Sequence, residues 1–162
     1  MTTFIRLFVV AFSLFLGLIG QALAFEGVVV GVADGDTVTV LDAQKTQHKI
    51  RLSGIDAPEK AQDYGERSKQ NLSKLVFGKK VEIPDGIKDR YGRTVSRVLV
   101  NGKDAGLEQI KGGFAWHYKK YQDEQPRDDR DVYHASEMAA KSQKLGLWSD
   151  LQPVAPWDFR KR

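Results

Sequence analysis

The chain has 162 residues, with 25 lysine and arginine residues against 21 aspartate and glutamate residues, and its isoelectric point is near 9.2. This length is typical of one domain, and the mildly basic charge is typical of proteins that meet polyanions. The sequence contains no cysteine, which excludes disulfide cross-links. Stability must therefore come from packing, with a bound metal as a further contributor.

The N-terminal segment, residues 1–24, has the features of a secretory signal peptide. A single positive charge at Arg6 is followed by an apolar run over residues 7–19 and by the small-residue pattern Ala22-Leu23-Ala24. This pattern predicts cleavage before Phe25 and a secreted or periplasmic mature protein with no stable membrane association. The alternative is an uncleaved membrane anchor, because the run approaches the shortest length that spans a bilayer.

The remainder predicts short strands that alternate with helices. Strands are expected in two runs within residues 27–40 and over 48–55, 80–83 and 94–100, and helices over 66–77, 104–111 and 132–145, with residues 118–131 as a polar loop. Five strands and about three helices indicate an α+β domain, and a small closed barrel with one helix between its third and fourth strands is a natural arrangement. We assign this domain to residues 25–150 and expect residues 151–162 to form an exposed tail.

Carboxylates gather at the ends of two predicted strands. Asp34 and Asp36 flank Gly35 at the head of one strand, and Asp56 ends another. Ca²⁺ requires several oxygen ligands, and carboxylates from separate strands can converge on one ion. Taken alone, residues 34–36 are better explained as ordinary turn chemistry, and the third carboxylate at Asp56 is what favours a functional role.

The stretch RLSGIDAPE, residues 51–59, places three charges beside a buried strand. In a regular strand Arg51 and Asp56 would face opposite sides. A bulge or bend at Gly54 would rotate Asp56 onto the face of Arg51, and the following proline fixes the turn that carries Glu59. We therefore predict that Arg51, Asp56 and Glu59 share one pocket, provided that the chain bends at Gly54.

A second arginine-rich segment is Asp89-Arg90-Tyr91-Gly92-Arg93, which on its own is a polar hairpin turn. Combined with the residues above, it completes the groups that phosphodiester hydrolysis requires. Guanidinium groups bind phosphate through paired donors and stabilise charge that develops in the transition state. A metal lowers the pKa of a bound water, and a nearby carboxylate accepts its proton.

These residues resemble the staphylococcal nuclease family, also called the micrococcal nuclease or thermonuclease family. The resemblance rests on motifs that occur in family order and cover residues 27–148 almost completely: VADGDTVTV (32–40), KIRLSGIDAPE (49–59), YGERSK (64–69), DRYGRTVSRVLVNGK (89–103), GFAWHYKKY (113–121) and KLGLW (144–148). One DGDT motif would be weak evidence, whereas the ordered set is highly specific.

The resemblance implies a five-stranded OB-type β-barrel with three helices, and it implies roles for individual residues. The calcium-binding groups would be Asp36, Asp56 and the carbonyl of Ala57, with Asp34 acting beside the metal through water. The catalytic residues would be Arg51 and Arg93, which contact the phosphate, and Glu59, the general base for the attacking water.

Substrate contacts follow from the same resemblance. Tyr121 matches one nucleotide-contacting tyrosine of the family, whereas Lys119 stands in the place of the other, for which Tyr118 is the nearest substitute. Arg90 stands where the family often has lysine, and with Tyr91 it is expected to contact the substrate.

The reaction implied is Ca²⁺-dependent endonucleolytic hydrolysis of DNA and RNA by a monomer, with 3′-phosphate and 5′-hydroxyl ends as products. Single-stranded or locally open substrates are expected, because their bases can stack on aromatic rings. The alternative function is a catalytically inactive OB-fold module that binds nucleic acid. Such a module would be expected to have lost Arg51, Glu59 or Arg93, and the chain keeps all three.

Overall fold

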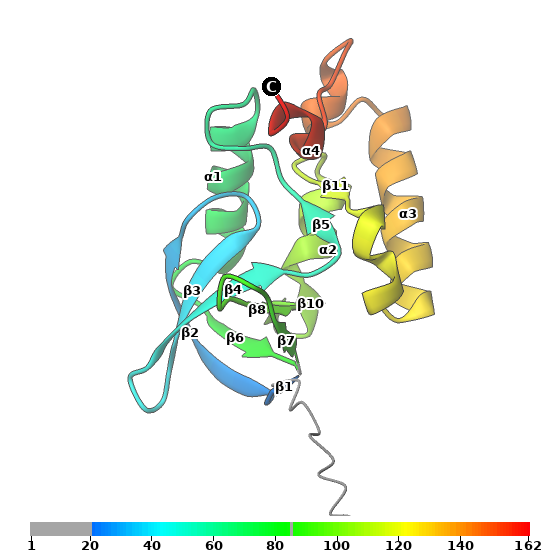
Figure 1. Ribbon diagram of the computed structural model, residues 1–162. Coiled ribbons are helices and arrows are strands. Elements are labelled where there is room, and N and C mark those ends of the chain that lie inside the picture. The colour runs from blue at the N-terminus through cyan, green and yellow to red at the C-terminus, as the bar shows by residue number, and fades with distance from the viewer. Residues whose placement is uncertain (1–20, 85) are drawn as a thin grey trace, which may run out of the picture.

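The computed structural model describes residues 21–84 and 86–162. The predicted signal peptide lies outside these residues except for its last four positions, of which Gln21–Ala22 (β1) pairs with β7 (Gly86–Lys88) at the edge of the main sheet (Figure 1). Within the described ranges, no helix has both the length and the apolar character needed to cross a membrane.

A curled, mostly antiparallel sheet forms the body of the molecule (Figure 1). Besides β1 and β7, its strands are β2 (Phe25–Val32), β3 (Thr37–Asp42), β4 (Gln47–Leu52), β6 (Lys80–Ile83), β8 (Thr94–Ser96), β9 (Leu99–Val100) and β10 (Lys103–Asp104). β8 pairs with β4, and β9 pairs with β6 on the far side of the sheet. Only two residues separate β8 from β9, so the segment 94–100 joins the two sides into a barrel. The predicted OB-type α+β fold is confirmed.

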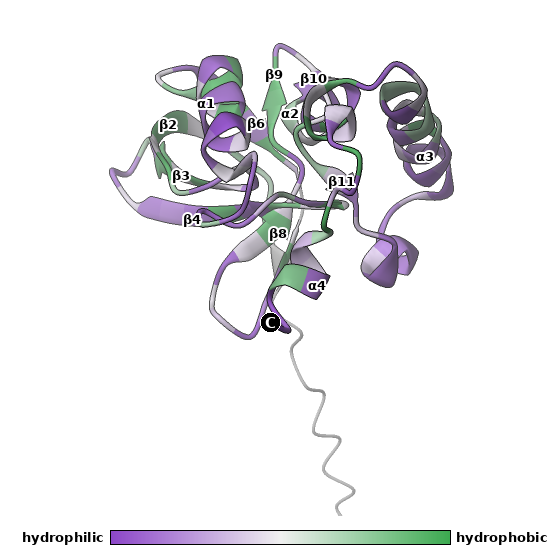
Figure 2. Ribbon diagram, turned by 90° about the horizontal axis from the view of Figure 1, so that it is seen from above, coloured by the Kyte–Doolittle hydropathy of each residue, from purple (hydrophilic) through white to green (hydrophobic). Residues whose placement is uncertain are grey.

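Aliphatic side chains fill the barrel. The fully buried ones are Val29, Val38, Val40, Ile50, Leu52, Val81, Ile83 and Val98 from the sheet region, and Ile55, Leu72, Val76 and Ile110 from the elements that cover it. The β-branched residues of the strands alternate between this interior and the outer surface, as half-buried strands require. In Figure 2 green marks parts of β2, β3, β8 and β9, whereas β4 is largely purple and α3 (Arg127–Ser142) carries both colours.

Three helices pack on the sheet and on one another. They are α1 (Gly65–Val76), α2 (Ala105–Lys111) and α3 (Arg127–Ser142), and α2 contacts both of the others. Asp104 caps α2 as predicted, because its carboxylate accepts the backbone N–H of Gly106 at 2.8 Å. The same carboxylate accepts the hydroxyl of Tyr133 at 2.6 Å, which ties α3 to the start of α2.

The predicted loop over residues 118–131 is wrong in its extent. Residues Lys119–Glu124 form a 3₁₀ helix (η1), and α3 begins at Arg127, five residues before the predicted start. Pro126 precedes the helix in an extended conformation, and Asp128 and Asp129 place negative charge in its first turn, where the helix dipole favours it. The polar composition that indicated a loop is therefore that of a helix N-terminus.

The expectation of an exposed tail over residues 151–162 is also wrong. Leu151 is exposed, but Ala155 and Pro156 are buried and begin a short helix, α4 (Pro156–Phe159). This helix follows a second 3₁₀ helix, η2 (Gly146–Ser149), and lies above β11 (Trp116–His117) in Figure 1. The segment folds back because its groups have partners distant in sequence, such as the Gln62 amide that donates to the Val154 carbonyl at 2.5 Å.

The predicted bend at Gly54 is confirmed. Its φ is +74°, a left-handed conformation that favours glycine. After this turn the chain leaves the main sheet and forms β5 (Ile55–Asp56), which pairs with β11 in a separate two-stranded sheet. A Cβ at this position would lie 2.0 Å from Gln125 Nε2 and 2.9 Å from Tyr133 Cε1, so space as well as backbone conformation requires glycine here.

We expect Gly54→Ala to destabilise the fold more than Gly78→Ala. Both glycines have positive φ, which costs an L-residue about 1–2 kcal/mol, but only at Gly54 would a Cβ meet other atoms. The added clash should raise the loss by a further ~1–3 kcal/mol. Urea unfolding midpoints of the two variants measure this difference. Equal losses of stability in the two variants would show that the side chains around Gly54 can move aside at little cost.

Candidate active site

Arg51 lies at the end of β4 with its guanidinium group fixed by the turn that follows. Nη1 donates to the carbonyl groups of Leu52 and Ile55, each at 2.9 Å. Nη2 lies 3.1 Å from Asp56 Oδ1 and 3.4 Å from Asp36 Oδ2. Only 14% of the side chain is exposed. The bend at Gly54 therefore creates both the backbone acceptors and the carboxylate that hold this arginine.

Asp36 stands at the head of β3 and links the two sheets. Its Oδ2 accepts the backbone N–H of Ala57 at 2.9 Å, and its Oδ1 accepts the hydroxyl of Thr37 at 3.0 Å. The preceding Gly35 packs closely, since a Cβ there would lie 2.7 Å from the Ala57 Cβ. The turn at residues 34–36 is thus held against the start of the segment that carries Glu59.

Asp34 supports this turn, because one of its carboxylate oxygens accepts the backbone N–H of Asp36 at 3.0 Å. Burial and the neighbouring charge of Asp36 raise the pKa of Asp34 to about 6. Burial also raises the pKa of Asp56, which is only 1% exposed, although Arg160 and Arg51 oppose that shift. Negative charge in this cluster is costly unless cations compensate it.

Glu59 joins the cluster through a residue that was not predicted, Arg160. Arg160 Nη1 donates to Glu59 Oε1 at 2.5 Å, and Nη2 donates to Asp56 Oδ2 at 2.7 Å. Nη1 also lies 3.3 Å from Asp56 Oδ1, so the guanidinium group binds the Asp56 carboxylate through both of its terminal nitrogens. The two carboxylates raise the pKa of Arg160 above its already high ordinary value.

Arg93 is close to this cluster along the sheet but has a different partner. It immediately precedes β8, in which Val95 lies beside Arg51 in register. Its Nε donates to Asp89 Oδ2 at 2.7 Å, and Asp89 Oδ1 accepts the backbone N–H groups of Tyr91 and Arg93 at 2.9 Å each. The structure therefore holds Arg93 within its own turn and does not join it to the carboxylates.

The predicted substrate residues fall into two groups. Tyr91 is 68% exposed, and the guanidinium groups of Arg90 and Arg93 lie 4.9 and 5.4 Å from its ring centre. Tyr118 and Tyr121 form the second group, and their ring centres are 5.3 Å apart. A third ring that was not predicted, Trp157 of α4, stacks on Tyr118 at 5.4 Å with an angle of 21°.

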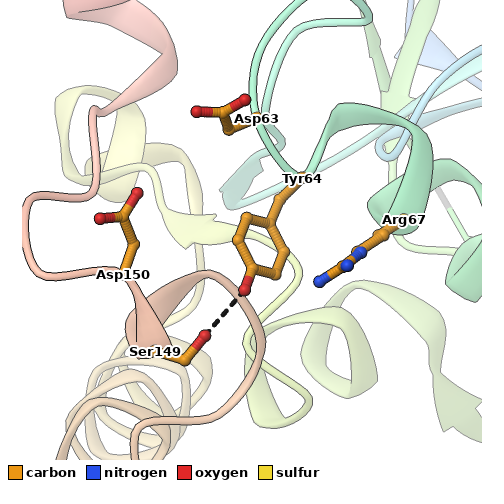
Figure 3. A pocket seen from close by; sticks show the side chains of 5 residues that line it. All are labelled: Asp63, Tyr64, Arg67, Ser149 and Asp150. Atoms are coloured by element: carbon orange, nitrogen blue, oxygen red, sulfur yellow. Dashed lines mark hydrogen bonds between the residues drawn. The ribbon is translucent and has the colours of Figure 1, made fainter.

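A separate hollow lies outside this cluster (Figure 3). It is an open cleft of about 470 Å³, lined by Asp63, Tyr64, Arg67, Ser149 and Asp150. A hydrogen bond of 2.7 Å between the hydroxyl groups of Tyr64 and Ser149 crosses it, and Arg67 approaches the face of the tyrosine ring. It contains none of the predicted site residues.

Sequence reasoning thus found the cluster of Arg51, Asp34, Asp36, Asp56 and Glu59 but missed Arg160 and Trp157. Both belong to the segment expected to be an exposed tail. Its sequence, PVAPWDFRKR over residues 153–162, does contain a signal, because two aromatic residues are unusual in so short a solvated terminus.

The chain is similar in sequence to known nucleases. The family model described as staphylococcal nuclease homologue matches residues 49–150. An uncharacterized endonuclease of Haemophilus influenzae is 39% identical over 134 residues, which cover 83% of this chain and 72% of that protein. An uncharacterized endonuclease of Escherichia coli O157:H7 is 42% identical over 138 residues, covering 85% of this chain and 86% of that protein.

A relative with a more specific name is the micrococcal nuclease of Shigella flexneri, which is 36% identical over 146 residues, covering 85% of this chain and 81% of that protein. Family match, relatives and site geometry agree that the molecule is a nuclease that cleaves phosphodiester bonds. The chain belongs to the staphylococcal nuclease family.

Proposed function

We propose that the protein is an exported, calcium-dependent endonuclease that hydrolyses DNA and RNA to 3′-phosphate and 5′-hydroxyl ends. One observation carries the proposal: the buried Arg51 guanidinium lies between the carboxylates of Asp36 and Asp56, with Glu59 three residues further along the chain. A barrel of this type also occurs in proteins that only bind nucleic acid, so the argument rests on these groups and not on the fold.

The two aspartates suit a hard cation. Their oxygens Asp36 Oδ2 and Asp56 Oδ1 lie within 3.4 Å of the same nitrogen of Arg51, so they converge on a small volume. Carboxylate and carbonyl oxygens are the ligands that Ca²⁺ prefers. No cluster of three or more histidine, cysteine, aspartate or glutamate side chains suited to a metal is found among residues 21–84 and 86–162. Asp36, Asp56 and the Ala57 carbonyl would therefore hold Ca²⁺ together with water, and Asp34 would act through a water ligand.

The remaining groups divide the chemistry of hydrolysis. Ca²⁺, when bound, would offset phosphate charge and lower the pKa of a water ligand. The Glu59 side chain is 38% exposed, so water can reach it, and its carboxylate is the proton acceptor for the attacking water. Arg51 provides a fixed positive charge beside the phosphate. Arg93, 26% exposed and held mainly by Asp89, can turn toward the charge that develops on phosphorus.

Two groups of aromatic rings favour substrates with accessible bases. Tyr118 and Tyr121 offer stacking surfaces in one group, and Tyr91 with Arg90 offers a ring and a charge in the other. Stacking of this kind is independent of sequence and of the 2′-hydroxyl, since every base has a flat face. We therefore propose single-stranded or locally open DNA and RNA as substrates.

Export is proposed on the sequence of residues 1–24. Cleavage after Ala24 would remove only β1 from the described sheet, because β2 begins at Phe25. The mature chain would keep the whole barrel, and monomer is the proposed state.

The protein should cleave single-stranded DNA in Ca²⁺ and stop in excess chelator. Labelled fragments should accept phosphate at their 5′ ends from polynucleotide kinase without prior dephosphorylation, since the 5′ hydroxyl is the leaving group. Restoring Ca²⁺ after chelation is the control for loss of folded protein. Binding without cleavage in both conditions, or cleavage that ignores the chelator, would contradict the proposed reaction.

Removing Arg93 or Glu59 should abolish most turnover and leave the fold intact. We expect Arg93→Ala and Glu59→Ala each to lower kcat by about 10²-fold or more, because one removes transition-state charge stabilisation and the other the proton acceptor. Arg97→Ala is the matched control, since Arg97 is a half-exposed arginine near Arg93 that pairs with Asp129. Circular dichroism checks folding, and near-normal rates for either test variant would refute its assigned role.

Asp36→Asn should weaken Ca²⁺ binding by at least about tenfold, because affinity for this ion depends on the number of charged oxygen ligands. Isothermal titration calorimetry without substrate measures the effect independently of turnover. Asp63→Asn serves as the control, because it removes the same charge in the separate cleft of Figure 3. Equal calcium affinity in Asp36→Asn and Asp63→Asn would exclude Asp36 from the metal site.

A further inference from the structure

The C-terminal strap, residues 153–162, lies over the groups assigned to catalysis. Its helix α4 is only four residues long, and it is held by contacts with three distant parts of the chain. Gln62 donates to the Val154 carbonyl, Trp157 packs on Tyr118 and Trp116, and Arg160 binds Asp56 and Glu59. Arg160 therefore contacts the proposed metal ligand and the proposed general base, and Trp157 contacts one proposed base-stacking ring.

Arg160 takes up the same oxygen atoms that a metal would need. Its two terminal nitrogens lie 3.3 and 2.7 Å from the two oxygens of Asp56. A cation on Asp56 and this guanidinium group cannot share those oxygens at bonding distance without like charges meeting in a half-buried space. The Glu59 carboxylate is occupied as well, because its Oε1 accepts a hydrogen bond from Arg160 Nη1.

Trp157 takes up a second part of the proposed site. It lies almost parallel to Tyr118, with ring centres 5.4 Å apart, which is the arrangement that a stacked base would adopt. The strap thus places the Arg160 guanidinium group on the carboxylates of Asp56 and Glu59, and it places the Trp157 ring on Tyr118.

We propose that the C-terminal strap is a built-in competitor of metal and substrate: Arg160 occupies the position of the cation, Trp157 occupies that of a base, and the strap must lift before the enzyme acts. This inference rests on the proposed calcium-dependent function. Two features suit a strap that opens: the Arg160 side chain is 42% exposed, and a hollow of about 190 Å³ remains beside Val154, Phe159 and Arg162. Few buried contacts and a short helix are typical of segments that open locally.

Competition makes a prediction about calcium affinity. Apparent affinity is reduced by the fraction of molecules in which the site is blocked, so removing the blocking charge should restore it. We expect Arg160→Gln to bind Ca²⁺ at least about threefold more tightly than the full-length wild-type protein in isothermal titration. Arg162→Gln is the matched control, because it removes the same charge from the same strap at an exposed position two residues away.

Hydrogen exchange provides a second readout on the wild-type protein. The amides of Asp158, Phe159 and Arg160 donate to carbonyl groups within the strap. Saturating Ca²⁺ should increase their exchange, and in Arg160→Gln exchange should already be fast without Ca²⁺. A purely structural arginine would predict the same exchange with and without the ion.

The outcomes separate the strap from the proposed function. If wild type, Arg160→Gln and Arg162→Gln bind Ca²⁺ equally, or if Arg160→Gln binds more weakly, the strap is no competitor and the calcium site stands. Unchanged or slower strap exchange in Ca²⁺ likewise overturns the strap alone. If wild type and Arg160→Gln both fail to bind Ca²⁺, the calcium dependence fails, and the competition fails with it.

Discussion

The ion pairs of Arg51 are the contacts on which the site depends. This side chain ends a strand of the barrel, yet its guanidinium group bonds to the carbonyl groups of the next turn and lies against carboxylates from two different sheets. Asp56 is almost fully buried, and a buried carboxylate is tolerated when it is paired with a charge and hydrogen-bonded. Arg51 therefore stabilises the fold, because its positive charge allows acidic residues to be buried at positions where a small barrel would otherwise have aliphatic residues.

Local backbone geometry makes that pairing possible. A strand that continued straight through Gly54 would keep Arg51 and Asp56 on opposite faces, whereas the left-handed turn sends β5 into a second sheet and brings the two into contact. Asp36 then closes the arrangement, because its carboxylate accepts the amide of Ala57 across the gap between the sheets. Asp36 is thus held by a backbone contact as well as by charge, and Asp56 is held by the guanidinium groups of Arg51 and Arg160, which fixes both acids as preorganised groups require.

Much of this could be predicted from the sequence, because the signals are local. β-branched alternation located the strands, and Gly54 was the one position in its strand where a bend was reasonable. The start of α3 was missed because charged residues that stabilise a helix N-terminus also occur in loops. Arg160 lies 101 and 104 residues from its partners, and no local pattern indicates a contact at that separation.

Charge balance at the cluster explains why the strap can be both stable and displaceable. Asp36, Asp56 and Glu59 face the two guanidinium groups of Arg51 and Arg160, which leaves one negative charge uncompensated when all three acids are ionised. A divalent cation in place of Arg160 would balance the charges of these three acids and leave only that of Asp34 when it is ionised, so the exchange gains electrostatic stabilisation where burial makes charge most costly. An incoming phosphate would then add negative charge beside these acids. Arg93 immediately precedes β8, whose Val95 lies beside Arg51 in register, and it is paired with Asp89 and not with the cluster, so it is available to meet that added charge.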